Sequence, residues 1–363
     1  MKVCHMTSAH GQEDIRIFIK ECTSLCEKGY EVYQVSCGTD YEKNGVHMMG
    51  VGSAESNRVR RMVKTAREVY LKAVTVDADV YHFHDPELLP YGLKLKKRGK
   101  VVVFDSHEDV PAQIMDKKWI MRPLRKTISK MYKLYETYTV KKLDAVVAAT
   151  SHIAKAFSNR CKRIVVVNNY PKLDDIEFHT QSFTERDGII CYAGGIDDLR
   201  GENIMIEAMK GSEGKLIIAG DHEVLYVGDN IRYVGRLDRS GVNNLYGTAI
   251  AGLCILKPIE NYYYSKPIKV YEYMAAGLPY ICSDFPEWRK VAEESGAGIC
   301  VNPDNIQEIK EAIKMLLINR EKGQIMGEKG RKYVLEKCNW NNEEKKLLSL
   351  YKDLEKECLS VRY

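Results

Sequence analysis

The sequence contains no apolar run that approaches the roughly 20 residues needed to cross a membrane. Its first ten residues, MKVCHMTSAH, also lack the long apolar segment of a secretion signal. The net charge of +5 over 363 residues is too small to indicate a nucleic-acid surface along the whole chain. We therefore expect a cytoplasmic globular protein without a nucleic-acid partner.

Metal-binding and disulfide patterns are scarce as well. The eleven cysteines are odd in number, include no CxxC pair, and several stand in apolar strand-like runs. Cys22 and Cys26 share a helix face, but no nearby His or Cys completes a metal-ligand set. These features indicate reduced cysteines packed in the core, with no disulfide framework.

Short apolar runs alternate with helix-length amphipathic segments along the whole chain. Continuous apolar strands spaced by helices favour parallel sheets covered on both faces, so we expect an α/β fold with two doubly wound Rossmann-like domains. Ligand sites in such domains lie at the carboxyl ends of the strands, and here they would face a cleft. The expected strands cover residues 2–6, 31–36, 80–83, 100–104, 145–149, 164–167, 189–193, 215–219, 231–234, 253–256 and 280–283.

The domain boundaries follow from a polar segment near the middle of the chain. Residues 168–187, NNYPKLDDIEFHTQSFTERD, contain a proline and show no sustained periodicity. We expect an N-terminal acceptor-side domain over 1–170, a linker over 171–187 and a nucleotide-sugar-binding domain over 188–340. Three helices are predicted after Val301, near 306–319, 321–338 and 342–359, and the last, within 341–363, is expected to return to the first domain.

The segment SKPIKVYEYMAAGLP, residues 265–279, is the most informative stretch of the chain. Ser265 is suited to cap a helix, Pro267 to stand near its start, and Gly277 to end it in a left-handed conformation. The helix start would present free N–H groups to an anion, and Glu272 one turn later offers two oxygens to a vicinal diol. The pattern thus fits a nucleotide, although an amphipathic helix packed on a sheet, with Lys269 and Glu272 as a surface pair, explains it equally well.

A second candidate phosphate site follows the first strand of the second half. In AGGIDDLRG, Gly194 and Gly195 allow close approach of the backbone to a ligand, Arg200 supplies a planar cation, and a helix begins at Gly201. A paired glycine at a strand end is more often a simple turn. The SKPIK helix start on the same predicted face makes the phosphate interpretation stronger.

Two histidines end strands in the first half, each followed by a carboxylate: His84 by Asp85, and His107 by Glu108. A capped turn or a satisfied polar cluster would explain them, but as a pair they are also suited to orient a bound sugar. We interpret His82 as a structural residue that points to the opposite face from His84. Because that placement separates the two imidazoles, no metal site is expected.

Four segments together resemble the retaining glycosyltransferases of family 4, which have GT-B architecture. They are EDIRIFIKECTSLCEKGYEV, DVYHFHDPELLPYGLKLKKRGKVVVFDSHED, CYAGGIDDLRG and SKPIKVYEYMAAGLPYICSDFPE. The resemblance spans nearly the whole chain. It implies a nucleotide-diphosphate sugar as donor, retention at the anomeric carbon, and neither a required metal nor a further cofactor.

The resemblance also implies roles for single residues. Glu272 corresponds to the glutamate that binds the ribose hydroxyls, and Arg200 to the cation on the diphosphate. Gly194 and Gly195 form the loop beneath it, and Ser265 and Lys269 fit the subgroup pattern before EYMA. His107 corresponds to the histidine near the donor sugar, and Gly11 to the loop that closes over it. His107, Arg200 and Lys269 are therefore the catalytic candidates, and His84, Asp85 and Glu108 the candidates on the sugar and acceptor side.

Two positions depart from the family pattern. Tyr264 stands where the family commonly has a second glutamate, eight positions before Glu272, so recognition of the sugar must differ there. Ile196 follows the loop glycines where an arginine is common. Arg200, helped by Lys269 or Lys266, would therefore carry the phosphate charge with less redundancy.

Residues 117–142 combine nine Lys or Arg with a single acid, Glu136. Apolar side chains recur at helical spacing at 120, 124, 128, 131, 135 and 138. An amphipathic basic helix of this kind suits the anionic inner face of a cell membrane, which would serve a lipid-linked acceptor. The alternative is that the apolar stripe packs on the sheet while the lysines are solvated.

The favoured function is transfer of a sugar from a UDP- or GDP-sugar to a hydroxyl of a glycan or lipid-linked acceptor, in cell-surface polysaccharide or glycolipid synthesis. A UDP-sugar 2-epimerase of the same architecture is an alternative, but it would need several acid and base carboxylates. A catalytically silent sugar-nucleotide-binding scaffold is another, suggested by Tyr264 and Ile196.

Overall fold

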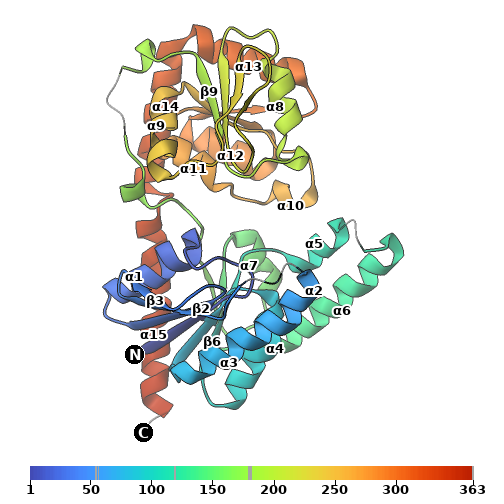
Figure 1. Cartoon of the computed structure of the whole chain (residues 1–363), viewed down its shortest axis with the longest axis vertical. Coiled ribbons are helices and arrows are strands. Elements are labelled where there is room, and N and C mark those ends of the chain that lie inside the picture. Colours follow the sequence, from blue (N-terminus) through green and yellow to red (C-terminus); the bar gives the residue numbers. More distant parts are fainter. Residues whose placement is uncertain (54, 56, 118–119, 179–181, 362–363) are drawn as a thin grey trace. The chain divides into compact units, whose positions relative to one another are not determined.

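The computed structural model describes residues 1–53, 55, 57–117, 120–178 and 182–361. Its contacts divide the chain into two compact units (Figure 1). Unit 1 contains Met1–Asn169 and the C-terminal residues from Asn341 onward, and unit 2 contains Tyr170–Trp340.

Unit 1 is built on an eight-stranded sheet in the order β3-β4-β2-β1-β5-β6-β7-β8 within the described residues. All neighbours are parallel except β3 and β4. The order runs outward in both directions from β1, which makes β1 and β5 the switch point of a doubly wound sheet. The strands are β1 (Lys2–Met6), β2 (Glu31–Ser36), β3 (Tyr41–Lys43), β4 (Val46–Gly50), β5 (Val80–Phe83), β6 (Val101–Ser106), β7 (Ala145–Ala148) and β8 (Ile164–Val166).

Helices cover both faces of this sheet, as Figure 1 shows. The inner strands are buried along their whole length, for example β5 and β7, which explains why they appear in the sequence as short continuous apolar runs. The π-helical segment η1 (Ile15–Cys22) leads into α1 (Thr23–Glu27). The other helices are α2 (Arg58–Arg60), α3 (Ala66–Val76), α4 (Leu89–Lys97), α5 (Val110–Asp116), α6 (Arg122–Val140), α7 (Ser151–Phe157) and α15 (Trp340–Val361).

The last helix, α15, packs on unit 1, as expected from the sequence. Tyr351 of α15 is fully buried, and its hydroxyl lies 2.9 Å from His82 Nδ1 on β5. Leu347 and Leu354 of the same helix are also fully buried. The chain therefore begins and ends in the same unit.

Unit 2 repeats the doubly wound plan with the strand order β11-β12-β10-β9-β13-β14-β15 in the described residues. Only β11 runs antiparallel to its neighbour. The strands are β9 (Ile189–Ala193), β10 (Lys215–Ala219), β11 (Leu225–Tyr226), β12 (Ile231–Tyr233), β13 (Ala251–Cys254), β14 (Tyr280–Ser283) and β15 (Gly298–Val301). The helices are α8 (Glu202–Met209), α9 (Arg239–Thr248), α10 (Glu260–Tyr263), α11 (Ile268–Ala275), α12 (Pro286–Ser295), α13 (Ile306–Ile318) and α14 (Arg320–Glu336).

The segment 171–187 is the one expected to be a linker. The contacts assign it to unit 2, where Ile176 and Phe183 are buried in the hydrophobic core. Its polar composition hides these two widely spaced apolar anchors, which have neither helical nor strand periodicity.

Four strands were not foreseen from the sequence. β3, β11 and β15 lie at sheet edges, and β4 pairs with the edge strand β3. β4 and β15 are only partly buried, so neither they nor the short edge strands have the long apolar signature of the central strands. The three C-terminal helices were predicted to within a few residues. Within the described part of the chain, no helix has both the length and the apolar character that a membrane crossing requires.

Candidate functional site

The glycine loop of unit 2 follows β9, the strand at the switch point of the sheet. Gly194 has φ +140°, and a Cβ at this position would lie 2.9 Å from the Lys269 ammonium nitrogen. The hydroxyl of Tyr192 donates to the Gly195 carbonyl at 2.6 Å and fixes the loop from below. Glycine at 194 is therefore required by both the backbone conformation and the close approach of Lys269.

Arg200 covers the second glycine of this loop. A Cβ at Gly195 would lie 2.1 Å from Arg200 Nη1, so a larger residue there would displace the guanidinium. Asp197 holds Arg200 in place, since one carboxylate oxygen accepts from the Arg200 backbone N–H at 2.8 Å and the other lies 3.1 Å from Nη1. The Arg200 side chain remains 45% exposed, which leaves donors available to a ligand.

Lys269 brings a second cation to the loop from α11. Its ammonium nitrogen lies 3.5 Å from the centre of the Tyr192 ring, a cation–π contact. Burial, reinforced by the positive charge of Arg200, lowers the pKa of Lys269 to about 8. Gly194, Gly195, Arg200 and Lys269 are thus gathered into one cluster, as the sequence patterns predicted.

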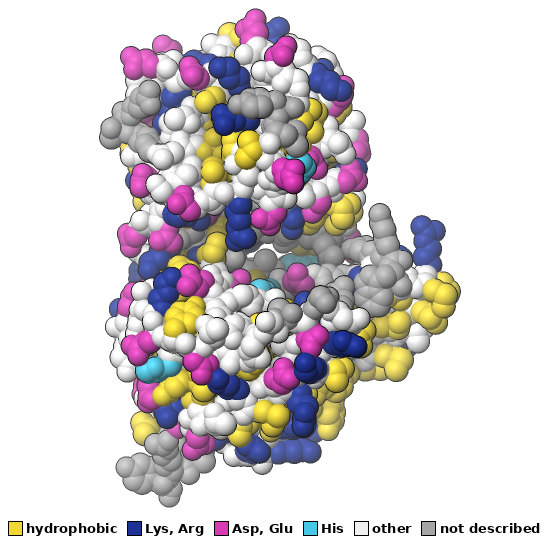
Figure 2. All heavy atoms as spheres, viewed as in Figure 1, with side chains coloured by type: hydrophobic (Ala, Val, Ile, Leu, Met, Phe, Trp, Pro, Cys, Tyr) yellow, Lys and Arg dark blue, Asp and Glu magenta, His cyan; other side chains and the backbone are white. Residues whose placement is uncertain are grey.

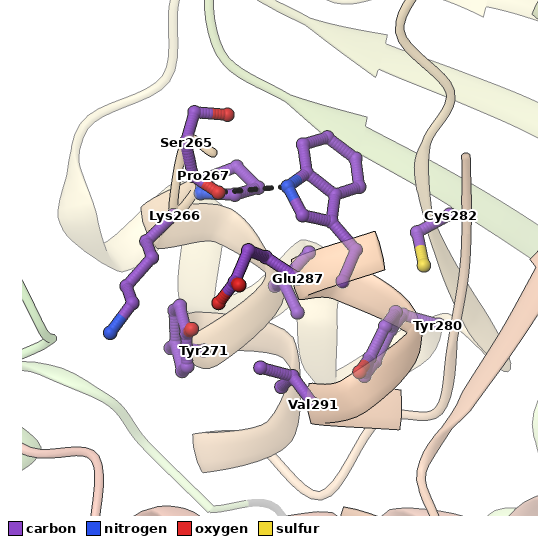
Figure 3. Close-up of a pocket in the computed structure, with 10 residues that line it drawn as sticks. Ser265, Lys266, Pro267, Tyr271, Tyr280, Cys282, Glu287 and Val291 are labelled. Carbon is purple, nitrogen blue, oxygen red and sulfur yellow. Dashed lines mark hydrogen bonds between the residues drawn. The ribbon is translucent and has the colours of Figure 1, made fainter. Parts of the chain in front are cut away.

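The start of α11 differs from the expected cap. The helix begins at Ile268 with Pro267 in the cap position, and the Ser265 hydroxyl donates to the Tyr262 carbonyl at 3.0 Å instead of capping α11. The Trp288 indole N–H donates to the Ser265 carbonyl at 2.8 Å (Figure 3). Ser265 therefore shapes the turn before α11, next to a cavity of about 20 Å³, and Gly277 ends the helix with φ +72° as predicted.

Glu272 lies one turn after Lys269 and has two partners that the sequence did not indicate. Its Oε1 accepts from Arg239 Nη2 at 2.9 Å and its Oε2 from the Tyr246 hydroxyl at 3.1 Å. The side chain is only 11% exposed. Arg239 opens α9, a different helix, so neither spacing nor composition could have paired it with Glu272.

The two positions that depart from the family pattern have different surroundings. Ile196 packs on Gly220, where a Cβ would lie 2.7 Å from the Ile196 Cδ1 atom, and it adds to the hydrophobic core. Tyr264 is 43% exposed. Lys266, considered as a helper cation, instead donates to the Tyr170 hydroxyl at 3.1 Å.

In unit 1, His84 and His107 converge on one buried carboxylate that sequence reasoning missed. Asp105 Oδ2 lies 2.9 Å from His107 Nε2 and 3.1 Å from His84 Nδ1. Arg16 completes the cluster with two hydrogen bonds of 2.9 Å to Asp105. Burial alone would raise the pKa of Asp105. The Arg16, His107 and His84 partners outweigh burial and hold this pKa well below its usual range.

The sequence could have indicated that Asp105 and His107 lie together. Asp105 precedes His107 by two residues at the end of β6, and side chains two residues apart on a strand share a face. His84 is fully buried behind this carboxylate, whereas the His107 side chain is 19% exposed. Of the two histidines, His107 is therefore the one placed to contact a substrate.

Asp85 organises the loop that follows β1. It accepts hydrogen bonds from the backbone N–H groups of Ser8 and Ala9 and from the Thr7 hydroxyl, at 2.6, 3.2 and 2.8 Å. Its second oxygen lies 3.1 Å from Nδ1 of His10, a residue that sequence reasoning did not single out. Burial by itself lowers the pKa of His10, but the contacts with Asp85 and more distant carboxylates give a net increase.

A pocket of about 340 Å³ opens at the carboxyl ends of β5 and β6, lined by His10, His107, Asp85 and Glu108 among others. The His10 and His107 ring centres are 5.5 Å apart. Glu108 is exposed, and Gly11 stands in an exposed part of the neighbouring loop with no atom within 4 Å of a built Cβ. The predicted acceptor-side residues thus lie on or near one pocket, with His84 buried beneath it.

The expectation for His82 was wrong. Side chains two residues apart on a strand point to the same face, so His82 and His84 lie together, with ring centres 4.8 Å apart. His5 on β1 joins them, because β1 and β5 are paired with His5 opposite His82. Burial lowers the pKa of His82 and of His5 well below the usual value.

The apolar stripe of residues 117–142 lies on α6 and faces outward, except for the buried Ile120. Exposed fractions are 65% for Met131, 63% for Leu134 and 54% for Tyr138. Figure 2 shows hydrophobic side chains gathered with Lys and Arg on this side of unit 1. Packing of the stripe on the sheet is therefore excluded for these residues.

Two family models match the chain. The model described as Glycosyl transferases group 1 matches residues 174–333, and the model described as Glycosyltransferase Family 4 matches residues 19–170. No curated protein sequence matches this chain.

Solved structures of low sequence identity share the fold. Sucrose-phosphate synthase from Thermosynechococcus elongatus is 16% identical with a TM-score of 0.77, and covers 98% of this chain and 99% of its own. Anabaena HepE, solved with UDP and glucose, is 10% identical with a TM-score of 0.74. The match covers 97% of this chain and 100% of HepE. WaaG, a glycosyltransferase involved in lipopolysaccharide biosynthesis, is 14% identical with a TM-score of 0.71. The match covers 95% of this chain and 98% of WaaG.

The fold is therefore GT-B, formed by two Rossmann-like α/β units, as the sequence predicted. The two family matches indicate the class of enzyme. They support the assignment of this chain to the GT-B glycosyltransferases, enzymes that transfer sugars.

Proposed function

We propose that this protein transfers a sugar, with retention, from a UDP- or GDP-sugar to a hydroxyl of a glycan or lipid-linked acceptor. The observation that carries the proposal is the cluster at the switch point of unit 2, where Arg200 and Lys269 stand over the Gly194–Gly195 loop. Cations at a glycine loop suit a diphosphate. The HepE structures solved with UDP, and with UDP-glucose, support a nucleotide-sugar donor.

In this proposal each residue of the cluster has a defined task. Arg200 and Lys269 stabilise the negative charge that grows on the diphosphate as the glycosidic bond breaks. Glu272 accepts hydrogen bonds from the ribose hydroxyls, and its two existing partners fix the orientation of the carboxylate. With two cations in place, no metal ion is needed at the diphosphate, and the departing phosphate oxygen accepts the proton of the incoming hydroxyl.

Unit 1 would provide the sugar and acceptor side. His107 is held by Asp105 and lines the pocket, which suits a hydrogen bond to a sugar hydroxyl. Asp85 holds the loop that contains Gly11, and thereby positions it for the donor sugar. Asp85 and His84 are positioning residues in this account, and Glu108 is free to meet the acceptor.

The surface of α6 supports placement at an anionic membrane. Lipid would cover the exposed Met131, Leu134 and Tyr138 side chains, while nearby Lys126, Lys130 and Lys133 would meet the negative headgroups. A lipid-linked acceptor, and with it synthesis of a cell-surface polysaccharide or glycolipid, would then be reached from the cytoplasmic face.

A thermal-shift screen against UDP- and GDP-sugars tests the donor, because a ligand that binds the folded state raises the unfolding temperature. One sugar nucleotide should give a shift and be turned over to UDP or GDP when a suitable acceptor is added. The anomeric configuration of the product, read by NMR, tests retention. Binding without turnover for any acceptor would favour a silent scaffold, and interconversion of the sugar at C2 would favour an epimerase.

A further inference from the structure

Four chemically active side chains meet inside unit 1, and one of them, His84, also lines the pocket. The cluster contains His5 on β1, Glu21 on η1, His82 on β5 and His84 directly after β5, and each is 0–3% exposed. Each offers one nitrogen or oxygen atom, and these four atoms lie within 4.8 Å of one another. The proposed sugar transfer uses none of them directly, except for the support that His84 gives to Asp105.

Several polar atoms of this cluster have no hydrogen-bond partner. They are both carboxylate oxygens of Glu21 and Nε2 of His82. Arg16 Nε lies 3.1 Å from Glu21 Oε1, but Arg16 directs its hydrogen bonds to Asp105 and to the Val167 carbonyl. A carboxylate so deeply buried is costly unless it is paired or binds a metal.

Two carboxyl groups share one cation in the cluster. Arg16 faces both Asp105 and Glu21, which are fully buried. Burial and the neighbouring Asp105 raise the pKa of Glu21 well above its usual value. Glu21 therefore holds a proton unless a further cation takes the place of that proton.

The ring nitrogens of the histidines lie close to one another and to Glu21. His84 Nδ1 lies 3.1 Å from Asp105, and His84 Nε2 lies 2.9 Å from His5 Nδ1. His82 Nδ1 lies 2.9 Å from the Tyr351 hydroxyl and 3.8 Å from Glu21 Oε2. An outer carboxylate or hydroxyl on the far ring nitrogen is the arrangement that orients histidine ligands of metals.

We propose that His5, Glu21, His82 and His84 form a structural binding site for a divalent transition metal, and that zinc is the ion it takes. Three imidazoles and one carboxylate form a four-coordinate set of the kind zinc accepts. With metal–ligand bonds of about 2.0–2.2 Å, tetrahedral ligand atoms are about 3.4 Å apart, so the four groups need only small movements. The ion would replace the proton of Glu21 as the positive charge beside this carboxylate.

The site would tie together parts of unit 1 that are distant in sequence. Its ligands come from β1, η1, β5 and the residue that follows β5. Tyr351 of α15 contacts two of them, since its hydroxyl lies 2.9 Å from His82 Nδ1 and 3.4 Å from His5 Nε2. A second candidate set, His84, Asp105 and His107, is less suited, because Asp105 is already occupied by two hydrogen bonds from Arg16. The role inferred is in folding, because the side chains are sealed from solvent.

Metal content of the full chain tests the proposal. The protein, carrying an affinity tag without histidines, is produced in zinc-supplemented medium, dialysed, and measured by inductively coupled plasma mass spectrometry. Wild type should retain about one zinc ion per chain, and a strong chelator should lower its unfolding temperature. Glu21→Gln and His82→Gln should each weaken retention by about tenfold or more, whereas His222→Gln, an exposed histidine of unit 2, should not.

Substitution inside a buried cluster can impair folding, so the wild-type protein provides a second measurement. Cobalt introduced during refolding should give the visible absorption of a four-coordinate site. The proposal is overturned if wild type holds less than about 0.1 metal ion per chain after both zinc-supplemented growth and refolding with zinc. A proton on Glu21 or a buried water would then balance the cluster. The proposal is also overturned if the folded Glu21→Gln and His82→Gln variants retain zinc at the wild-type level.

Discussion

Lys269 and Tyr192 form the contact around which the unit 2 site is built. The ammonium nitrogen of Lys269 lies 3.5 Å from the centre of the Tyr192 ring, and the Tyr192 hydroxyl donates to the Gly195 carbonyl at 2.6 Å. One tyrosine thus supports both the cation and the glycine loop. The site is held rigid before any ligand arrives, which is what charge stabilisation in a transition state requires.

The pH dependence of nucleotide binding should follow Lys269. Its pKa of about 8, lowered by burial and by Arg200, makes it mostly charged at pH 7 and mostly neutral at pH 9. A diphosphate favours the charged form, so the Kd for UDP or GDP should rise between these pH values. Calorimetric titration should show this rise in wild type and a flatter, weaker profile in Lys269→Met. An unchanged slope in Lys269→Met would remove this residue from the diphosphate.

Glu272 should distinguish nucleotides by their ribose hydroxyls. A hydrogen bond to a charged group contributes about 1.5–3 kcal/mol, so Glu272→Gln should weaken binding of the ribonucleotide by about tenfold or more. The matched 2′,3′-dideoxynucleotide should bind wild type and Glu272→Gln almost equally. If the substitution weakens both nucleotides alike, Glu272 acts only through its contacts with Arg239 and Tyr246.

Asp105 should be a major contributor to the stability of unit 1. Asp105→Asn leaves Arg16 as a buried guanidinium without its ionised partner, which should lower the free energy of unfolding by about 3 kcal/mol or more. Urea unfolding measures the change. Asp77→Asn, which removes an exposed ion pair with Lys100, should change the stability little. Equal effects of the two substitutions would contradict the buried network.

The α6 surface should bind anionic membranes. Wild type should float with anionic vesicles at low salt and less at high salt, because headgroup attraction is screened. Replacing both Met131 and Leu134 by Ser should abolish flotation at either salt concentration. Ile318→Ser is the matched control, an exposed apolar residue of α13 in unit 2. If wild type does not float even at low salt, membrane placement is ruled out.

Much of the fold could be predicted because central strands such as β7 and β13 are buried on both faces and stand out as apolar runs. The edge strand β3 could not, because its exposed side chains include charged residues. Its neighbour β4 could not, because it is only partly buried and lacks a continuous apolar run. The burial of Ile176 and Phe183 in the segment 171–187 could not be predicted either, because these two residues follow no periodic pattern.

The residues of the candidate site in unit 2 could be proposed from the sequence because they lie in two compact motifs, which contain Gly194, Gly195, Arg200, Lys269 and Glu272. Their partners were missed, since Arg239 reaches Glu272 from 33 residues away. In unit 1 the buried pairs are separated even further, with Arg16 and Asp105 89 residues apart. The error at His82 had a different origin, because residues two apart on a strand share a face, and this could have been seen in the sequence.

The most direct test of the central claim is release of UDP or GDP from a sugar nucleotide by wild type and by Arg200→Ala. Removal of one preorganised group that stabilises the transition state lowers turnover by about 10²-fold or more. We predict that wild type turns over one sugar nucleotide, and that Arg200→Ala loses this activity to that degree with an unchanged unfolding temperature, since Arg200 is exposed. Wild-type turnover by Arg200→Ala, or failure of the wild-type protein to bind any sugar nucleotide, would contradict the account.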